Sequence, residues 1–286
     1  MTVTVINAGL LTTVQDLGRP GHAHLGVPRS GALDQPAHRL ANRLVGNPAT
    51  AATLETTVLG CAVRVDRVVT VAVAGAPCSV RVDGRPAAWA APVRLRAGAL
   101  LEVGPATRGV RSYVAFAGGI AAAPVLGSRS TDLLSGLGPA PLTPGEALPL
   151  GEPVGPAAGA DVVPAPAPPD PLLLPVLFGP RDDWFTARSL AVLTGSGYRV
   201  SPTSNRIGLR LDGPPLDRAR EGELPSEGMV LGAVQVPPDG RPVVFLADHP
   251  TTGGYPVIGV IPSSALPAVA QAAPGTPVRF TPMGRR

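Results

Sequence analysis

Lysine is missing from this sequence of 286 residues, and all 24 of its Lys and Arg side chains are arginine. A chain without lysine cannot form a Schiff base, supply a P-loop lysine or carry covalently attached biotin. Aromatic residues make up only 3% of the chain, and no basic run alternates with stacking side chains. The net charge of +4 therefore gives little reason to expect nucleic-acid binding.

Cysteine is also scarce. Cys61 and Cys78 form neither a C-x-x-C pair nor a zinc-ligand spacing, which is typical of a protein from a reducing cytosol. No apolar run reaches the roughly 18 residues that a membrane span needs, and the first residues lack the features of a signal peptide. We therefore expect a cytoplasmic protein with no membrane association and no bound metal.

Glycine and proline are abundant, with 35 and 36 residues, beside 44% hydrophobic residues. This composition indicates a folded chain that is rich in turns. Short apolar or alternating segments between those turns predict a mainly β protein with few helices. We expect strands at 2–6, 63–65, 69–74, 80–82, 93–96, 113–117, 172–178, 207–211 and 243–247. An Asp83-Gly84 hairpin turn is expected between two of them.

One helix is well marked in the sequence. Asp34 can cap its N-terminus, and apolar residues recur with helical spacing from Ala37 to Val45. Gly46 is expected to end it. His38 lies off the apolar stripe, so we predict that it is solvated.

Prolines recur without hydrophobic periodicity between Pro139 and Pro171. Part of this region is typical of an extended polyproline-like linker. We therefore predict an N-terminal β lobe at 1–163, a proline-rich linker at 164–171 and a C-terminal β lobe at 172–286.

Polar groups gather at strand ends and turns between Ser226 and Pro256. A hydrophobic strand ends in Asp248, and the turn at 251–254 can offer backbone N–H groups to an anion or a carbonyl oxygen. Gln235 lies inside an apolar run, so it must face a hydrogen-bonding partner or a cavity. This stretch is the predicted site.

The polar residues of this stretch, together with Ser204-Asn205-Arg206 at the start of another strand, suit a small acyl, lactam or carboxylate substrate. The predicted catalytic residues are Arg206, as a fork for a carboxylate or phosphate, with Glu227 and Asp248 as acid or base. The predicted substrate-binding residues are Asn205, Gln235, Thr251, Thr252, Gly253, Gly254 and Tyr255. A structural network that braces barrel corners explains the same spacing equally well.

A long polar loop at 11–35 supplies a second group of candidates. Hydrogen-bonding side chains at this density between ordered elements indicate a site more than a spacer, although a solvated surface loop is the alternative. The predicted second-site residues are Gln15, Asp16, Arg19 and Ser30.

Several motifs resemble those of a known protein family. They are TTVQDLGRPG (12–21), GVPRSGALDQ (26–35), ANRLVGNPATAATLE (41–55), SYVAFAGGI (112–120), GSRSTDL (127–133), DDWF (182–185), SNRIGLRLDG (204–213), ELPSEGMVLGAVQVPPDGRP (223–242) and TTGGYPVIGVI (251–261). The sequence resembles the KipA family, also called allophanate hydrolase subunit 2 or the biotin-dependent carboxyltransferase family. This family includes the C subunit of bacterial 5-oxoprolinase. The sequence departs from the family pattern at His249-Pro250, where Arg-Gln is usual.

The resemblance implies a cyclophilin-like β-barrel architecture with two packed lobes. It implies a component of an ATP-dependent lactam hydrolase that opens 5-oxo-L-proline to L-glutamate and is inactive alone. The implied partners are two further components of that enzyme, one KipI-like and the other LamB/YcsF-like. The complex would use ATP, and this chain would hold no cofactor.

Two other functions follow from the same resemblance. One is a component of a biotin-dependent carboxyltransferase of the urea carboxylase type, with biotin carried on another chain. The other is a non-catalytic regulator that binds a KipI-like kinase inhibitor.

Overall fold

The computed structural model describes residues 1–158, 169–222 and 224–284. Its contacts divide the chain into two compact units. The sandwich unit comprises the described parts of Met1–Arg19, Ser30–Asp132 and Gly136–Ala167, and the barrel unit those of Pro20–Arg29, Leu133–Ser135 and Pro168–Arg286. Most of the predicted linker at 164–171 lies outside the described residues.

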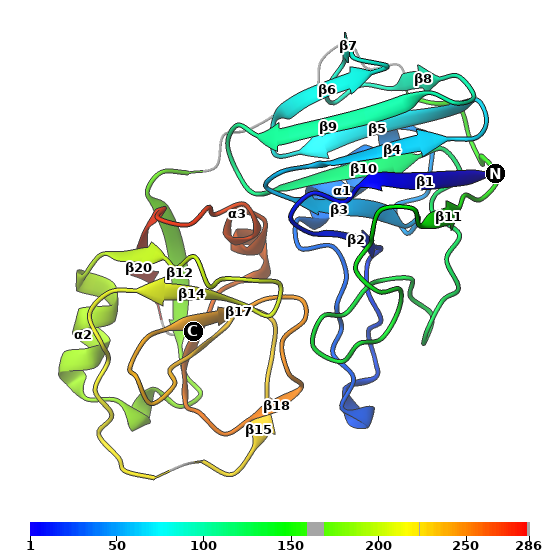
Figure 1. Ribbon diagram of the computed structural model, residues 1–286. Helices are drawn as coiled ribbons and strands as arrows, with labels where there is room; N and C mark the ends of the chain where they lie inside the picture. Colours follow the sequence, from blue (N-terminus) through cyan, green and yellow to red (C-terminus); the bar gives the residue numbers. More distant parts are fainter. Residues whose placement is uncertain (159–168, 223, 285–286) are drawn as a thin grey trace. The chain divides into compact units, whose positions relative to one another are not determined.

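The sandwich unit contains two antiparallel sheets that share one hydrophobic core (Figure 1). The first sheet has the order β11 (Ala147–Pro149), β1 (Thr2–Asn7), β4 (Cys61–Val65), β9 (Leu100–Ala106), β6 (Cys78–Val82), β7 (Arg85–Ala87). The second has the order β2 (Thr12–Gln15), β3 (Thr53–Thr57), β10 (Arg111–Phe116), β5 (Val69–Gly75), β8 (Val93–Leu95). The strands expected in this part of the sequence are therefore confirmed.

The sequence pattern explains how the strands of this unit are buried. β10 lies between β3 and β5, and all six of its residues are buried. In β1, by contrast, Val3 and Val5 are buried while Thr2 and Thr4 are partly exposed, as an alternating strand requires. The β6–β7 turn has positive φ at Asp83 and Gly84, which confirms the expected Asp-Gly hairpin.

The helix α1 (Gln35–Leu44) packs against β5 and β10. The Asp34 carboxylate accepts a hydrogen bond from Ala37 N at 3.1 Å, so the expected N-cap is confirmed. Gly46 follows the helix with a φ of 77°, a left-handed conformation that suits glycine.

The prediction that His38 is solvated is wrong, because its ring is fully buried. Nδ1 lies 2.9 Å from Thr53 Oγ1, and Nε2 lies 3.1 Å from the Ala49 carbonyl oxygen. Burial lowers the pKa of His38 below its ordinary value, which favours the neutral ring. The spacing of apolar residues along the helix did not predict this burial. The partners of His38 are Ala49 and Thr53, which lie in the chain after the helix.

The barrel unit is a closed β-barrel (Figure 1). Its strand order is β12 (Leu172–Phe178), β19 (Val257–Val260), β16 (Ala233–Gln235), β17 (Val243–Phe245), β14 (Gly208–Asp212), β13 (Tyr198–Val200), β20 (Pro277–Pro282). β20 runs parallel to β12 and closes the barrel, whereas the other neighbours pair antiparallel. Along β12 the buried Leu172, Leu174 and Val176 alternate with residues that are at least partly exposed.

Short elements complete the barrel unit. They are β15 (Glu227–Gly228), which pairs with β18 (Thr252–Gly253), the helices α2 (Ala187–Gly195) and α3 (Leu266–Ala270), and the 3-10 turns η1 (Ala23–Leu25), η2 (Asp182–Trp184) and η3 (Ser263–Ala265). The expected mainly β fold with a barrel and a few short helices is confirmed. Within the described residues, no helix is both long enough and apolar enough to span a membrane.

Candidate functional site

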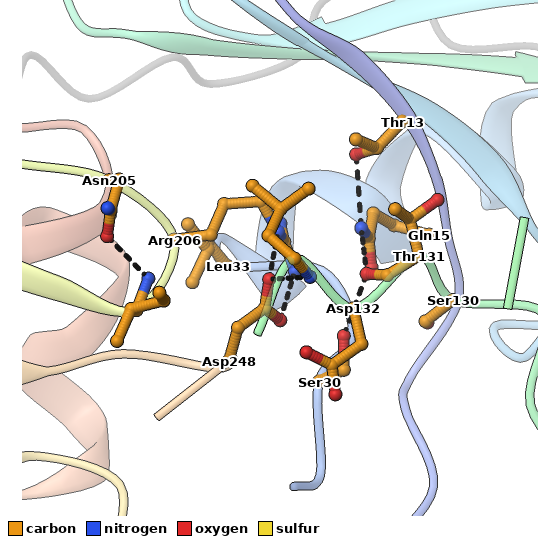
Figure 2. Close-up of polar contacts among 12 residues, drawn as sticks. Thr13, Gln15, Ser30, Leu33, Ser130, Thr131, Asp132, Asn205, Arg206 and Asp248 are labelled. Carbon is orange, nitrogen blue, oxygen red and sulfur yellow. Dashed lines mark hydrogen bonds and ion pairs between the residues drawn. The ribbon is translucent and has the colours of Figure 1, made fainter. Parts of the chain in front are cut away.

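Arg206 and Asp248 form a buried ion pair in the barrel unit. Arg206 Nε donates to Asp248 Oδ2 at 2.9 Å, and Nη2 donates to Oδ1 at 3.0 Å (Figure 2). β14 and β17 run antiparallel, so the segment before β14 meets the segment after β17. Both side chains are at most 1% exposed. Asp248 therefore does not reach solvent, and the Arg206 fork expected to hold a substrate is occupied by Asp248.

A backbone segment from elsewhere in the sequence also uses this pair. Leu133 N donates to Asp248 Oδ2 at 3.2 Å, and Asp248 N donates to the Arg206 carbonyl at 3.1 Å. Leu133 groups with the barrel unit. The pair thus fixes three pieces of chain that are distant in sequence.

Glu227 has a different environment. Arg181 Nε donates to Glu227 Oε2 at 3.0 Å, and Arg181 Nη2 contacts Oε1. The side chains of Arg181 and Glu227 are 37% and 29% exposed, respectively. The hydrogen bonds from Arg181 lower the pKa of the Glu227 carboxyl below its ordinary value. Glu227 is therefore ionised near neutral pH, which suits a proton acceptor better than a donor.

Gln235 is tied to the turn that follows Asp248. It is 7% exposed, and its Nε2 donates to the Tyr255 carbonyl at 3.2 Å. A Cβ atom on Gly253 would lie 3.0 Å from this Nε2, and Gly253 itself pairs with Glu227 between β18 and β15. The structure thus brings Glu227, Gln235, Gly253 and Tyr255 into one neighbourhood.

The other predicted substrate-binding residues are used in part by the chain itself. Asn205 Oδ1 accepts from Ile207 N at 2.9 Å and so caps its own turn (Figure 2). The carbonyls of Thr251 and Gly254 accept hydrogen bonds from segment 224–229. Thr252 is exposed in β18. The 251–254 turn is therefore accessible at Thr252, whereas Asn205 Oδ1 already accepts a hydrogen bond from Ile207 N.

The second-site residues of the sandwich unit converge on the motif at 127–133. The Asp16 carboxylate accepts hydrogen bonds from Ser128 Oγ, Ser130 Oγ and Arg129 N, each at 2.6 Å. Gly18 N donates to the same carboxylate at 2.8 Å. With four donors, Asp16 holds the 128–130 segment in one conformation, and this makes it a positioning residue rather than an open acid.

The remaining three second-site residues reach the same segment. Gln15 Nε2 and Ser30 Oγ both donate to the Thr131 carbonyl, at 3.0 and 2.9 Å (Figure 2). Arg19 Nη1 lies 3.8 Å from Asp132 Oδ2. Gln15 Oε1 and Thr131 Oγ1 are buried and have no hydrogen-bond partner in the part of the chain that the structure describes. These two atoms therefore have hydrogen-bonding capacity that the described residues do not use.

Comparison with known proteins agrees with this architecture. Residues 25–282 match the family model described as "Carboxyltransferase domain, subdomain A and B". The chain belongs to this family. The resemblance stated from the sequence motifs is thereby confirmed.

The family members that the chain resembles include two kinds of protein. It is 39% identical to the C subunit of 5-oxoprolinase from Escherichia coli K12, over 96% of this chain and 89% of that protein. It is 33% identical to urea amidolyase of Lachancea kluyveri, over 98% of this chain but 17% of that protein. The crystal structure of K. lactis urea amidolyase has a TM-score of 0.90 and 29% identity, over 99% of this chain and 19% of that chain.

Sequence reasoning missed the residue that pairs with Glu227 and lowers its pKa. Arg181 follows β12 in the segment GPRDDWF and is held by a hydrogen bond from its N to the Val257 carbonyl at 3.1 Å. A charged triplet directly after a buried strand was the available signal. The partner lies 46 positions away, so nothing local in the sequence marks the pairing.

Proposed function

We propose that this chain is the C subunit of an ATP-dependent 5-oxoprolinase. The observation that carries the proposal is the match to the C subunit of Escherichia coli 5-oxoprolinase, which extends over nearly the full length of both chains. The urea amidolyases, in contrast, are several times longer than this chain. A match over nearly the full length of the 5-oxoprolinase subunit favours the same role for this chain.

The reaction adds water across the lactam C–N bond of 5-oxo-L-proline, giving L-glutamate, and ATP hydrolysis by the complex drives it. The proposed partners are a KipI-like protein and a LamB/YcsF-like protein, which complete the enzyme. The chain is inactive alone in this proposal, because it contributes only part of the site.

The barrel unit supplies three groups to the proposed site. Glu227, hydrogen-bonded by Arg181, accepts a proton from the attacking water or an intermediate. The 251–254 turn offers N–H groups to the developing oxyanion. Gln235 holds the Tyr255 end of that turn in place. Arg206 and Asp248 act here as a buried brace and do not touch the substrate.

Reconstitution tests the proposal. The chain is co-expressed with the KipI-like and LamB/YcsF-like proteins encoded in the same genome, and glutamate release from 5-oxoproline is measured with and without ATP. We expect ATP-dependent release that disappears when this chain is omitted. Assembly of the three proteins without any glutamate release would overturn the proposal.

Carboxyl transfer is a second candidate, which the family description and the urea amidolyase matches favour. Because the chain lacks lysine, biotin would arrive on another protein. Activity that requires bicarbonate and urea and is blocked by avidin would identify this function. Binding of the KipI-like protein without any turnover would instead favour the regulatory role.

A further inference from the structure

Among the described arginines of the barrel unit, Arg181, Arg206 and Arg218 are at least partly buried, and the first two face carboxylates. Their pairs are Arg181–Glu227 and Arg206–Asp248, and the exposed Arg220 and Arg241 pair with Asp183 and Asp212. Arg218 is half-buried, yet none of the described carboxylates pairs with it. A charge that leaves water without an opposite charge is costly, so this residue needs a separate explanation.

The guanidinium of Arg218 is held in a fixed orientation. Its Nη2 donates to the Val236 carbonyl at 2.9 Å. Its central carbon lies 5.8 Å from the centroid of the Tyr255 ring, a cation–π distance. Its backbone forms an isolated bridge with Phe185. These contacts orient the fork but supply no negative charge.

The fork still has hydrogen atoms to donate. A guanidinium carries five N–H groups, and among the described residues only the Val236 carbonyl accepts a hydrogen bond from this one. Arg218 Nε is buried and has no acceptor among the described residues. A planar fork with unused donors matches the two oxygens of a carboxylate.

The position of Arg218 joins it to the polar turn. Tyr255, which the guanidinium contacts, lies next to Gly254 in the chain, and its carbonyl accepts from Gln235. Val236, whose carbonyl holds Arg218, is the neighbour of Gln235. Arg218 therefore lies beside the residues that the proposed function uses.

We propose that Arg218, backed by the Tyr255 ring, binds the carboxylate of a small substrate. It takes the role that the sequence had suggested for Arg206, which Asp248 occupies. A single fork suits a monovalent carboxylate, whereas a phosphate is usually surrounded by several donors. The identification of this carboxylate with that of 5-oxoproline rests on the proposed function, but the anion site itself does not.

A binding experiment tests the site without any turnover. The purified full chain is titrated calorimetrically with 5-oxoproline and with 2-pyrrolidinone, the same lactam without the carboxylate. We expect the carboxylate to tighten binding by about 10- to 100-fold, as a charged hydrogen bond does. In Arg218→Met this preference disappears, and in Arg218→Lys it is partly retained.

Arg199→Met is the matched control. Arg199 also donates to a backbone carbonyl, that of Gly275 at 3.0 Å, but it lies in β13 away from the Tyr255 turn. We expect this variant to keep the full preference for the carboxylate. If R218M and R199M unfold at the same midpoint, the loss of the carboxylate preference in R218M comes from the missing guanidinium and not from unfolding.

The outcomes separate this inference from the proposed function. In the reconstituted complex, R218M should raise KM for 5-oxoproline by a similar factor while kcat changes little. If the complex does not hydrolyse 5-oxoproline but the carboxylate preference is lost in R218M alone, the anion site stands and the proposed function falls. If R218M keeps the preference, or if wild type shows none either alone or in the complex, the inference is overturned.

Discussion

The barrel unit contains two arginine–carboxylate pairs with similar contacts and opposite surroundings. In both, a guanidinium contacts the two oxygens of one carboxylate. Arg206 and Asp248 are at most 1% exposed, whereas Arg181 and Glu227 are 37% and 29% exposed. Burial, rather than the type of contact, separates the two pairs.

The difference in exposure gives the two ion pairs different roles. A buried pair has lost its hydration, so removing one partner leaves a stranded charge, and the fold depends on both. A partly exposed pair is hydrated on one side and contributes little to folding, so its carboxylate can exchange partners with a ligand or a proton. The buried pair is therefore a brace, and the open pair is the reactive one.

Replacement of Glu227 gives the largest expected effect. Glu227→Gln removes the proton acceptor and should lower kcat of the reconstituted complex by about 10²- to 10⁴-fold with assembly intact. Glu221→Gln, at an exposed glutamate of the preceding loop, is the control and should keep full activity. Full activity of E227Q would refute the catalytic role.

Replacement of Asp248 tests the brace. Asp248→Asn leaves Arg206 buried without its counter-charge and should lower the free energy of unfolding by about 3–5 kcal/mol. Urea unfolding is followed by Trp184 fluorescence in a Trp89→Phe background, which isolates the signal of the barrel unit.

Asp212→Asn is the control for that measurement. Asp212 pairs with Arg241 at 3.2 Å, but both side chains are about half exposed, at 47% and 58%. Its loss should cost less than about 1 kcal/mol. Equal losses in D248N and D212N would contradict the distinction between buried and open pairs.

The pH dependence of activity should depend on Arg181. In wild type, hydrogen bonds from Arg181 lower the pKa of Glu227, so the base stays ionised as the pH falls. Arg181→Met returns this pKa towards its ordinary value and moves the acidic limb of kcat/KM to higher pH. The stability that the pair contributes is present above the unfolded-state pKa and is lost as the pH falls through the lowered folded-state pKa. An unmoved acidic limb in R181M would contradict the assignment.

Salt should give the smallest effect. The Debye length falls from about 10 Å at 0.1 M to about 3 Å at 1 M, which screens exposed charges more than buried ones. The difference in unfolding midpoint between wild type and R181M should shrink over this range, while that between wild type and D248N should persist. Equal salt dependence of both differences would show that the pairs do not differ in hydration.

Features that depend on neighbouring residues were predictable from the sequence. The Asp34 cap, the Asp83-Gly84 turn and the alternation of β1 and β12 each rest on a few adjacent positions. Gln235 was expected to need a partner because an amide inside an apolar strand cannot be left unsatisfied, and the Tyr255 carbonyl is that partner.

Pairings across the barrel were not predictable in the same way. The sequence marks Arg206, Glu227 and Asp248 as polar residues at strand ends, but it does not say which carboxylate meets which arginine. That depends on strand order, because the pairing of β14 with β17 joins Arg206 to Asp248. His38 was misjudged for the same reason, since Thr53 and Ala49 approach it only in the folded chain.

The parallel seam between β12 and β20 has a consequence for biosynthesis. Leu172 pairs with Val278, so the first and last strands of the barrel form one ladder. A ribosome delivers β12 early and β20 last, so the seam cannot form until Pro282 has left the exit tunnel. Until then β12 presents an unpaired edge, the kind of surface on which nascent chains aggregate. The barrel can therefore close only after β20 has been translated.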